Sequence, residues 1–328
     1  MAVSWGFVIF YLFSVLNIDM KRFIIKTLWI GCVIAGLFVI FCLFLRYCGF
    51  SDFAYKRFTV GKQHSLVIGT SRSAQGIHPA VINDYFSGNS EFSLPIYNFS
   101  FTVTDSPYGE VYYNAIRKIL NADRERNKKG LFILSVDPWS LSMEDTWDAE
   151  GCREKASCVN KIKLTGMNPN FQYLAYYFQL RDMTWVDQTM QLQDDGWLKI
   201  NFSMANTALV NENVKQKCAL YRTYRMTKSL YRLCWLEKTI VLLKQYGDVY
   251  MCRMPVHVEM LEIENANWGN FEEDIRKISS FHGVPYISFV YEVDKYRTID
   301  GNHLCKDDGA LFTKNLCDSI KTYYNGIY

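Results

Sequence analysis

The sequence lacks the residue spacing that is typical of metal sites. It has five histidines, and its ten cysteines include no C-x-x-C pair and no Cys/His cluster with metal-ligand spacing, so we expect no structural zinc and no cofactor. The net charge of +3 is too small to indicate a nucleic-acid partner. There is no internal repeat and no low-complexity tract. A chain of 328 residues is long enough for one large domain and a membrane segment.

What the sequence does contain is a long apolar run near its beginning. Thr27 to Leu45 carries no charge and has about the length that a helix needs to cross a bilayer. Lys21, Arg22 and Lys26 precede this run, and the positive-inside rule keeps such a flank in the cytoplasm. A cleaved signal peptide is the alternative. The length of the run and the lack of a small-x-small cleavage site after it favour a retained membrane helix.

A second apolar stretch, Ala2 to Ile18, leaves the number of membrane spans open. It is uncharged but marginal in length, so it is either a first span or upstream sequence translated in error, with Met20 as the start. Both versions place the basic flank inside and residues 50–328 in the periplasm or outside the cell. We therefore expect residues 1–49 to anchor the chain in the cytoplasmic (inner) membrane and residues 50–63 to form a juxtamembrane linker.

Strand-like apolar runs alternate with helical patterns after the linker. The runs are Leu66–Ile68, Ile96–Asn98, Leu131–Val136, Val249–Met254 and Tyr286–Phe289. Helical spacing covers Ser106–Asn121, Cys218–Tyr246, Phe271–Phe281 and a last segment that ends near Tyr323. Strands that alternate with helices predict a doubly wound, three-layer α/β domain over residues 64–328, with a mostly parallel sheet.

Two segments admit more than one interpretation. Residues 140–217 break the alternation and form an aromatic-rich insertion, whose rings either stack on sugars or build a small core of their own, which we favour. Tyr221 to Arg232 is basic and aromatic, but its helical spacing continues to Leu243. We interpret it as one amphipathic helix with a solvated basic face, which an anionic glycan or lipid headgroup could still use. Cys152 and Cys158 flank a polar loop and are expected to form a disulfide in an oxidising compartment.

The most specific chemical signal joins two distant segments. The first strand run ends in Gly69-Thr-Ser71-Arg-Ser73, and Asp300-Gly-Asn-His303 precedes the last helix. An aspartate three residues before a histidine can hold the imidazole Nδ1–H, which leaves Nε2 to accept a serine proton. No other histidine in the chain has an acidic residue at this spacing. The alternatives are an ordinary serine-rich turn and a helix cap beside a surface histidine.

These segments resemble the first and last blocks of the SGNH (GDSL-type) hydrolase superfamily. The similarity is closer to its membrane-anchored bacterial branch, which includes alginate O-acetylation and teichoic-acid D-alanylation proteins. Ile96-Tyr-Asn-Phe-Ser100 resembles the second block, which implies that Ser100 offers a backbone N–H to an oxyanion. Phe132 to Pro138 resembles the third block, whose usual asparagine falls on Asp137. An ionised aspartate there would repel an oxyanion unless it takes up a proton or pairs with Arg72 or Arg253.

The resemblance implies a membrane-anchored, extracytoplasmic esterase or O-acyltransferase that acts on an acyl ester of a cell-envelope or exported polysaccharide. Ser71 would be the nucleophile, His303 the general base and Asp300 its orienter, with a membrane acyl-donor protein as a possible partner. Arg253, at the end of a strand, could bind an anionic or acyl group, or could have a structural role with its hydrogen bonds satisfied inside the domain. The alternative is a catalytically inert domain of the same type that binds a glycan or scaffolds an envelope-assembly complex.

Overall fold

The computed structural model describes residues 18–48, 52–88, 91–121, 128–144, 152–179, 189–292 and 295–324. Contacts divide the chain into two compact units, Met1–Gly49 and Phe50–Tyr328.

The described part of the first unit, residues 18–48, is one long helix, α2 (Ile18–Cys48). From Ile18 to Leu45 it is long and apolar enough to cross a membrane, and the predicted run lies inside it. Apolar side chains such as Trp29 and Ile34 are exposed, whereas the core helix of a soluble protein would bury them. The helix is therefore a candidate membrane span, although a signal sequence would share its length and composition. Residues 2–17 of the second apolar stretch lie outside the described residues.

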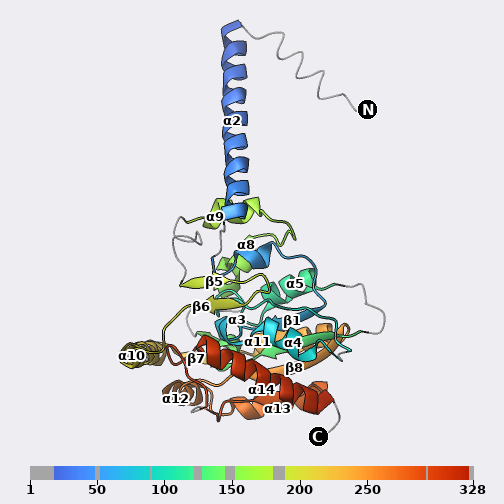
Figure 1. The fold of residues 1–328 in the computed structure, drawn as a ribbon, viewed down its shortest axis with the longest axis vertical. Coiled ribbons are helices and arrows are strands. Elements are labelled where there is room, and N and C mark those ends of the chain that lie inside the picture. Colours follow the sequence, from blue (N-terminus) through green and yellow to red (C-terminus); the bar gives the residue numbers. More distant parts are fainter. Residues whose placement is uncertain are drawn as a thin grey trace. The chain divides into compact units, whose positions relative to one another are not determined.

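The second unit is built on a five-stranded parallel sheet with the order β2-β1-β3-β8-β9 (Figure 1). Its strands are β1 (Ser65–Ile68), β2 (Ile96–Asn98), β3 (Gly130–Ser135), β8 (Gly247–Arg253) and β9 (Tyr286–Ser288). Each predicted strand run corresponds to one of them within two residues. The chain passes from β1 to β2 and then returns past β1 to β3. This reversal places a topological switch point at the carboxyl ends of β1 and β3.

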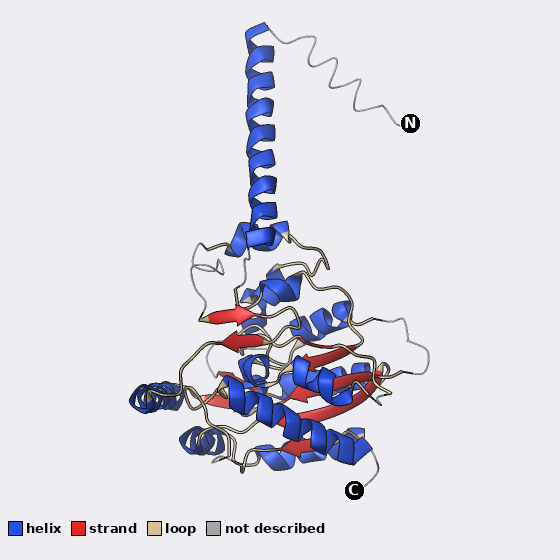
Figure 2. Cartoon of the chain, viewed as in Figure 1, coloured by secondary structure: helices blue, strands red, loops and turns tan. Residues whose placement is uncertain are grey.

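Helices cover both faces of this sheet, as the α/β prediction requires (Figure 2). On one face Val67 and Ile133 of the strands belong to a buried cluster with Phe312 and Ile320. That layer contains α3 (Ser71–Gly76), α4 (Pro79–Phe86) and α14 (Lys306–Tyr324), of which α14 contacts both other helices. The other layer contains α5 (Glu110–Ile119), α11 (Leu230–Leu243) and α13 (Phe271–His282), of which α11 contacts β8 and both other helices.

The segment 140–217 leaves the central sheet, as predicted. Some of its described aromatic side chains pack into the domain: Tyr173 is buried, and Trp197 Nε1 donates to the carbonyl of Gln75 at 2.8 Å, whereas Phe171 and Tyr176 are exposed. Trp147 and Trp185 lie outside the described residues. Besides α11, the described elements between β3 and β8 are α6 (Pro138–Leu141), β4 (Ser142–Glu144), α7 (Cys152–Ala156), α8 (Cys158–Lys161), α9 (Phe171–Tyr177), β5 (Met190–Leu192), β6 (Leu198–Ile200), α10 (Thr207–Thr223) and β7 (Met226–Lys228).

The single helix predicted over Cys218–Tyr246 is wrong. Helix α10 ends at Thr223, β7 pairs antiparallel with β4, and α11 begins at Leu230. Ser229 caps α11 by accepting the N–H of Arg232. Arg232 was expected on a solvated face, but it is buried and lies 2.9 Å from Glu154 Oε1. Helical spacing could not reveal the break, because the partner strand β4 lies far away in the sequence.

The predicted linker, residues 50–63, is instead part of the second unit. It contains the short helix η1 (Tyr55–Phe58), and Arg57 is fully buried and donates to the carbonyls of Asn98 and Gly196. A cation with such partners cannot belong to a loose tether. The expected disulfide is also not formed, because Cys158 is a free, buried thiol beside Asp105 at the start of α8.

Candidate active site

The structure brings together the three residues predicted to form a triad. Ser71 begins α3 directly after β1, and His303 lies on the loop before α14. Ser71 Oγ is 2.9 Å from His303 Nε2, and His303 Nδ1 is 2.9 Å from Asp300 Oδ2. Ser71 and Asp300 are partly exposed, while His303 between them is buried. Ser71 thus meets Asp300 and His303, which lie 229 and 232 positions later in the sequence, at the carboxyl end of the sheet.

The surroundings of Asp300 fix the state of the histidine. Burial acts to raise the pKa of the Asp300 carboxyl, but the charge and hydrogen bond of His303, Lys217 at 3.7 Å and the backbone N–H of Asn302 outweigh burial and hold that pKa well below its usual range. An ionised carboxylate only accepts hydrogen bonds. Nδ1 of His303 therefore donates to Asp300, and in the neutral imidazole the lone pair of Nε2 faces Ser71.

Ser73, the second serine of the same turn, has a different environment. It is buried, and its Oγ lies 3.0 Å from the carbonyl oxygen of Thr70 and 2.9 Å from Ser100 Oγ. Position 69 requires glycine in this turn, because a Cβ there would clash with Ser73 Oγ at 2.4 Å. The turn thus presents Ser71 to the histidine and directs Ser73 into the interior.

A buried ionic cluster lies behind Ser71. Arg72 Nη2 is 2.5 Å from Glu264 Oε1, and Arg253 Nη2 is 2.8 Å from Glu264 Oε2. Glu264 lies on α12 (Val258–Asn267), and Trp139 Nε1 also donates to it. Burial acts to raise the pKa of Glu264, but the two guanidinium charges outweigh it and lower that pKa. Glu272 accepts from Arg253 Nη1, which balances two positive charges with two negative ones.

This cluster decides between the alternatives that the sequence left open for the two arginines. Arg253 is almost fully buried and both of its terminal nitrogens are held by carboxylates, so it is not available to bind an anionic or acyl group. Neither Arg72 nor Arg253 forms a described hydrogen bond with Asp137. Their bonded nitrogens donate to Glu264, Glu272 and Asn302, and Arg72 Nη1 and Arg253 Nε have no hydrogen-bond partner among the described residues. Their charges still act on Asp137 through space.

The two remaining predicted residues have other partners. The backbone N–H of Ser100 donates to Asn98 Oδ1 at 3.1 Å, so it is already engaged and is not a free oxyanion donor. Asp137 caps α6 by accepting the N–H of Ser140 at 3.0 Å, and its Oδ2 accepts from Thr70 Oγ1. Burial raises the pKa of Asp137, although the charge of Arg72 acts to lower it. Asp137 therefore retains its proton to higher pH than an exposed aspartate does.

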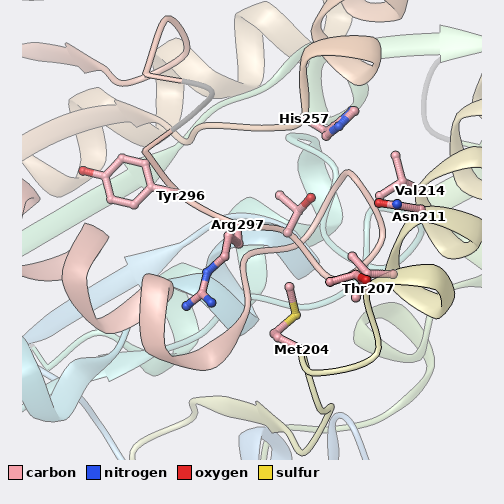
Figure 3. A pocket seen from close by; sticks show the side chains of 9 residues that line it. Met204, Thr207, Asn211, Val214, His257, Tyr296 and Arg297 are labelled. Atoms are coloured by element: carbon pink, nitrogen blue, oxygen red, sulfur yellow. The ribbon is translucent and has the colours of Figure 1, made fainter.

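A cavity of about 360 Å³ flanks the loop that carries Asp300 (Figure 3). Val214 of α10 and His257 line it, and both also lie against Gly301, the residue after Asp300. The lining mixes apolar and polar side chains: Met204, Thr207, Val210, Asn211, Val214, His257, Tyr296, Arg297 and Thr298. Within the described residues, no group of three or more His, Cys, Asp or Glu side chains is arranged to hold a metal ion.

Sequence reasoning missed two residues of this region. Glu264 has no recognisable motif around it, since α12 follows β8 as an ordinary helix. Asn302 lies within the D-x-x-H segment, but its contact with Arg72 depends on folding. No known family model, curated protein or solved structure matches this chain, so the SGNH resemblance stays a prediction.

Proposed function

We propose that this chain is a membrane-anchored serine esterase or O-acyltransferase of the SGNH type, acting on an acyl ester of a cell-envelope or exported polysaccharide. The observation that carries the proposal is the continuous hydrogen-bonded series Ser71 Oγ, His303 Nε2, His303 Nδ1 and Asp300 Oδ2. A serine so placed transfers its proton to the imidazole as Oγ attacks an ester carbonyl. The protonated His303 then returns the proton to the leaving alkoxide.

The acyl-enzyme is resolved by water in an esterase and by a sugar hydroxyl in a transferase. In both cases the same proton transfers run through His303, while the ionised Asp300 stabilises the imidazolium. The backbone N–H of Ser71 is available for an oxyanion, because the first residues of a helix have no intrahelical acceptor. The cavity beside Asp300 has a mixed lining that suits an acyl chain or a sugar ring.

The experiment that tests this proposal is an assay of residues 50–328, which form a compact unit. A small acetyl ester is offered with and without oligosaccharide acceptors, and acetate and acetylated sugar are measured. Release of acetate alone indicates an esterase, and acetyl transfer to the sugar indicates an acyltransferase. If neither product forms and a serine-reactive fluorophosphonate does not label the protein, the result favours the catalytically inert, glycan-binding alternative. Asp137 also supports that alternative, because an ionised aspartate there would repel an oxyanion.

The proposed location gives a second prediction. Because Lys21, Arg22 and Lys26 precede the apolar run, a reporter fused after Tyr328 should be active only outside the cytoplasm. Alkaline phosphatase, which needs an oxidising compartment, and a cytoplasmic reporter fused at the same position form the matched pair. Activity of the cytoplasmic reporter would overturn both the orientation and the proposed envelope substrate.

The third prediction concerns Asp137. Asparagine caps a helix as well as aspartate does, so Asp137→Asn should fold normally. We expect the variant to raise kcat/KM for a small acetyl ester, by up to about a hundredfold, because an amide N–H can donate to the oxyanion where an ionised carboxylate repels it. Since burial raises the pKa of Asp137, the gain should be smallest at low pH and grow as the wild-type carboxyl ionises. A fall in kcat/KM at every pH would show that the carboxylate assists the reaction.

A further inference from the structure

Asn302 lies between the two residues of the D-x-x-H segment that act in the proposed mechanism. It is almost fully buried, and its backbone N–H donates to Asp300 Oδ1 at 3.0 Å. Gly301 before it has φ +82°, in the left-handed region that favours glycine. This turn directs the Asn302 side chain toward the reacting end of His303 instead of toward solvent.

The contacts of Asn302 determine which way its amide points. Its Oδ1 lies 2.9 Å from Arg72 Nε and 2.5 Å from Arg72 Nη2. A guanidinium has only donors, so the atom facing Arg72 must be the oxygen. The amide nitrogen therefore faces the other way, and it lies 3.4 Å from His303 Nε2. Among the described residues, this Nδ2 has no other hydrogen-bond partner.

The ionic cluster behind Ser71 holds this orientation. Arg72 is fixed by Glu264, and Glu264 is fixed in turn by Arg253 and Trp139. All four of these side chains are buried. A donor that is positioned before the reaction loses little energy to reorganisation when charge develops beside it.

The Asn302 amide loses its acceptor at the step in which an oxyanion appears. In the resting site Ser71 Oγ, at 2.9 Å, and Asn302 Nδ2, at 3.4 Å, face the same lone pair of His303 Nε2. During attack the Ser71 Oγ–carbon bond forms, the carbonyl π pair moves onto the oxygen, and the Ser71 proton takes up the Nε2 lone pair. Nε2 is then a donor, and the Asn302 N–H is left without its acceptor at the step in which the negative charge develops.

We infer that Asn302 Nδ2 donates a hydrogen bond to the oxyanion of the acyl-transfer intermediate. This role rests on the proposed function. It supplies the amide donor that position 137 lacks. A contact that strengthens only in the transition state raises kcat and leaves substrate binding almost unchanged.

Two variants of the full-length protein in detergent test this inference. Asn302→Asp keeps an acceptor for Arg72 and removes the amide donor, whereas Asn302→Ala removes both. For a small acetyl ester, measured on the high-pH plateau of each rate profile, we expect kcat to fall about 10²- to 10³-fold in both variants, with KM within about threefold of wild type. Asn267→Asp, at the end of α12, makes the same chemical change away from the site and should leave kcat unchanged.

The outcomes separate this inference from the proposed function. Asn302→Asp should keep the thermal midpoint of the wild type, because Arg72 keeps its partner, so a loss of kcat in this variant does not come from unfolding. Either variant retaining more than about a tenth of wild-type kcat would overturn the oxyanion role while leaving the triad intact. An unchanged kcat, with the whole loss of kcat/KM coming from a higher KM, would likewise overturn the oxyanion role and would indicate that Asn302 binds the substrate. Wild-type protein without Ser71-dependent turnover would refute both proposals.

Discussion

Replacing Ser71 by alanine should abolish both labelling by a fluorophosphonate probe and turnover of an acetyl ester. Ser71 Oγ is the hydroxyl that contacts His303 Nε2, at 2.9 Å, and no other hydroxyl among the described residues contacts that nitrogen. Members of a catalytic triad act as a unit, so Ser71→Ala and His303→Ala should each reduce kcat by about a thousandfold or more. The measurements are probe incorporation on a gel and steady-state hydrolysis.

Ser73 provides the matched control for this experiment. It lies in the same turn, two residues away, but its Oγ contacts Thr70 and Ser100 and not the histidine. Ser73→Ala should therefore retain labelling and most of the activity, with at most a modest loss of stability from its two missing buried hydrogen-bond contacts. An inactive Ser73→Ala together with an active Ser71→Ala would show that the nucleophile has been assigned to the wrong serine.

Replacing Glu264 by alanine should destabilise the domain by about 3 to 5 kcal/mol. The carboxylate is fully buried and neutralises the guanidinium groups of Arg72 and Arg253 at 2.5 and 2.8 Å. Without it, two positive charges remain in the interior with only Glu272 to balance them, and Trp139 Nε1 loses its acceptor. Urea denaturation of residues 50–328 measures the free energy of unfolding.

Glu259 on the same helix is the control for Glu264. It pairs with Arg222 at 3.0 Å, but both side chains are largely exposed. Exposed ion pairs contribute little, so Glu259→Ala should change the free energy of unfolding by less than about 1 kcal/mol. Similar effects of the two substitutions would mean that water reaches Glu264 and that the cluster does not fix Arg72 and Asn302 as described.

Most of the central sheet was predictable from local pattern. Buried parallel strands are short continuous apolar runs, so Leu66–Ile68 and Ile96–Asn98 can be recognised without any knowledge of their neighbours. The break between α10 and α11 was not predictable in this way, because β7 exists only through its pairing with β4. The prediction of a linker over residues 50–63 was wrong for a similar reason. Local sequence gives no sign that Arg57 is buried, because its carbonyl partners, Asn98 and Gly196, are distant in the sequence.

The sequence by itself determined the chemistry that the site can offer: a serine after the first strand, and an aspartate three residues before a histidine ahead of the last helix. The distance from Asp300 to His303 is set within one turn of chain, so that pair follows from spacing alone. The tertiary structure decided the rest. It brought Ser71 to His303 across the sheet edge, engaged Arg253 and the Ser100 N–H elsewhere, and placed Glu264 and Asn302 beside the serine turn. Contacts between distant segments depend on the packing of the whole domain, and local sequence carries no record of them.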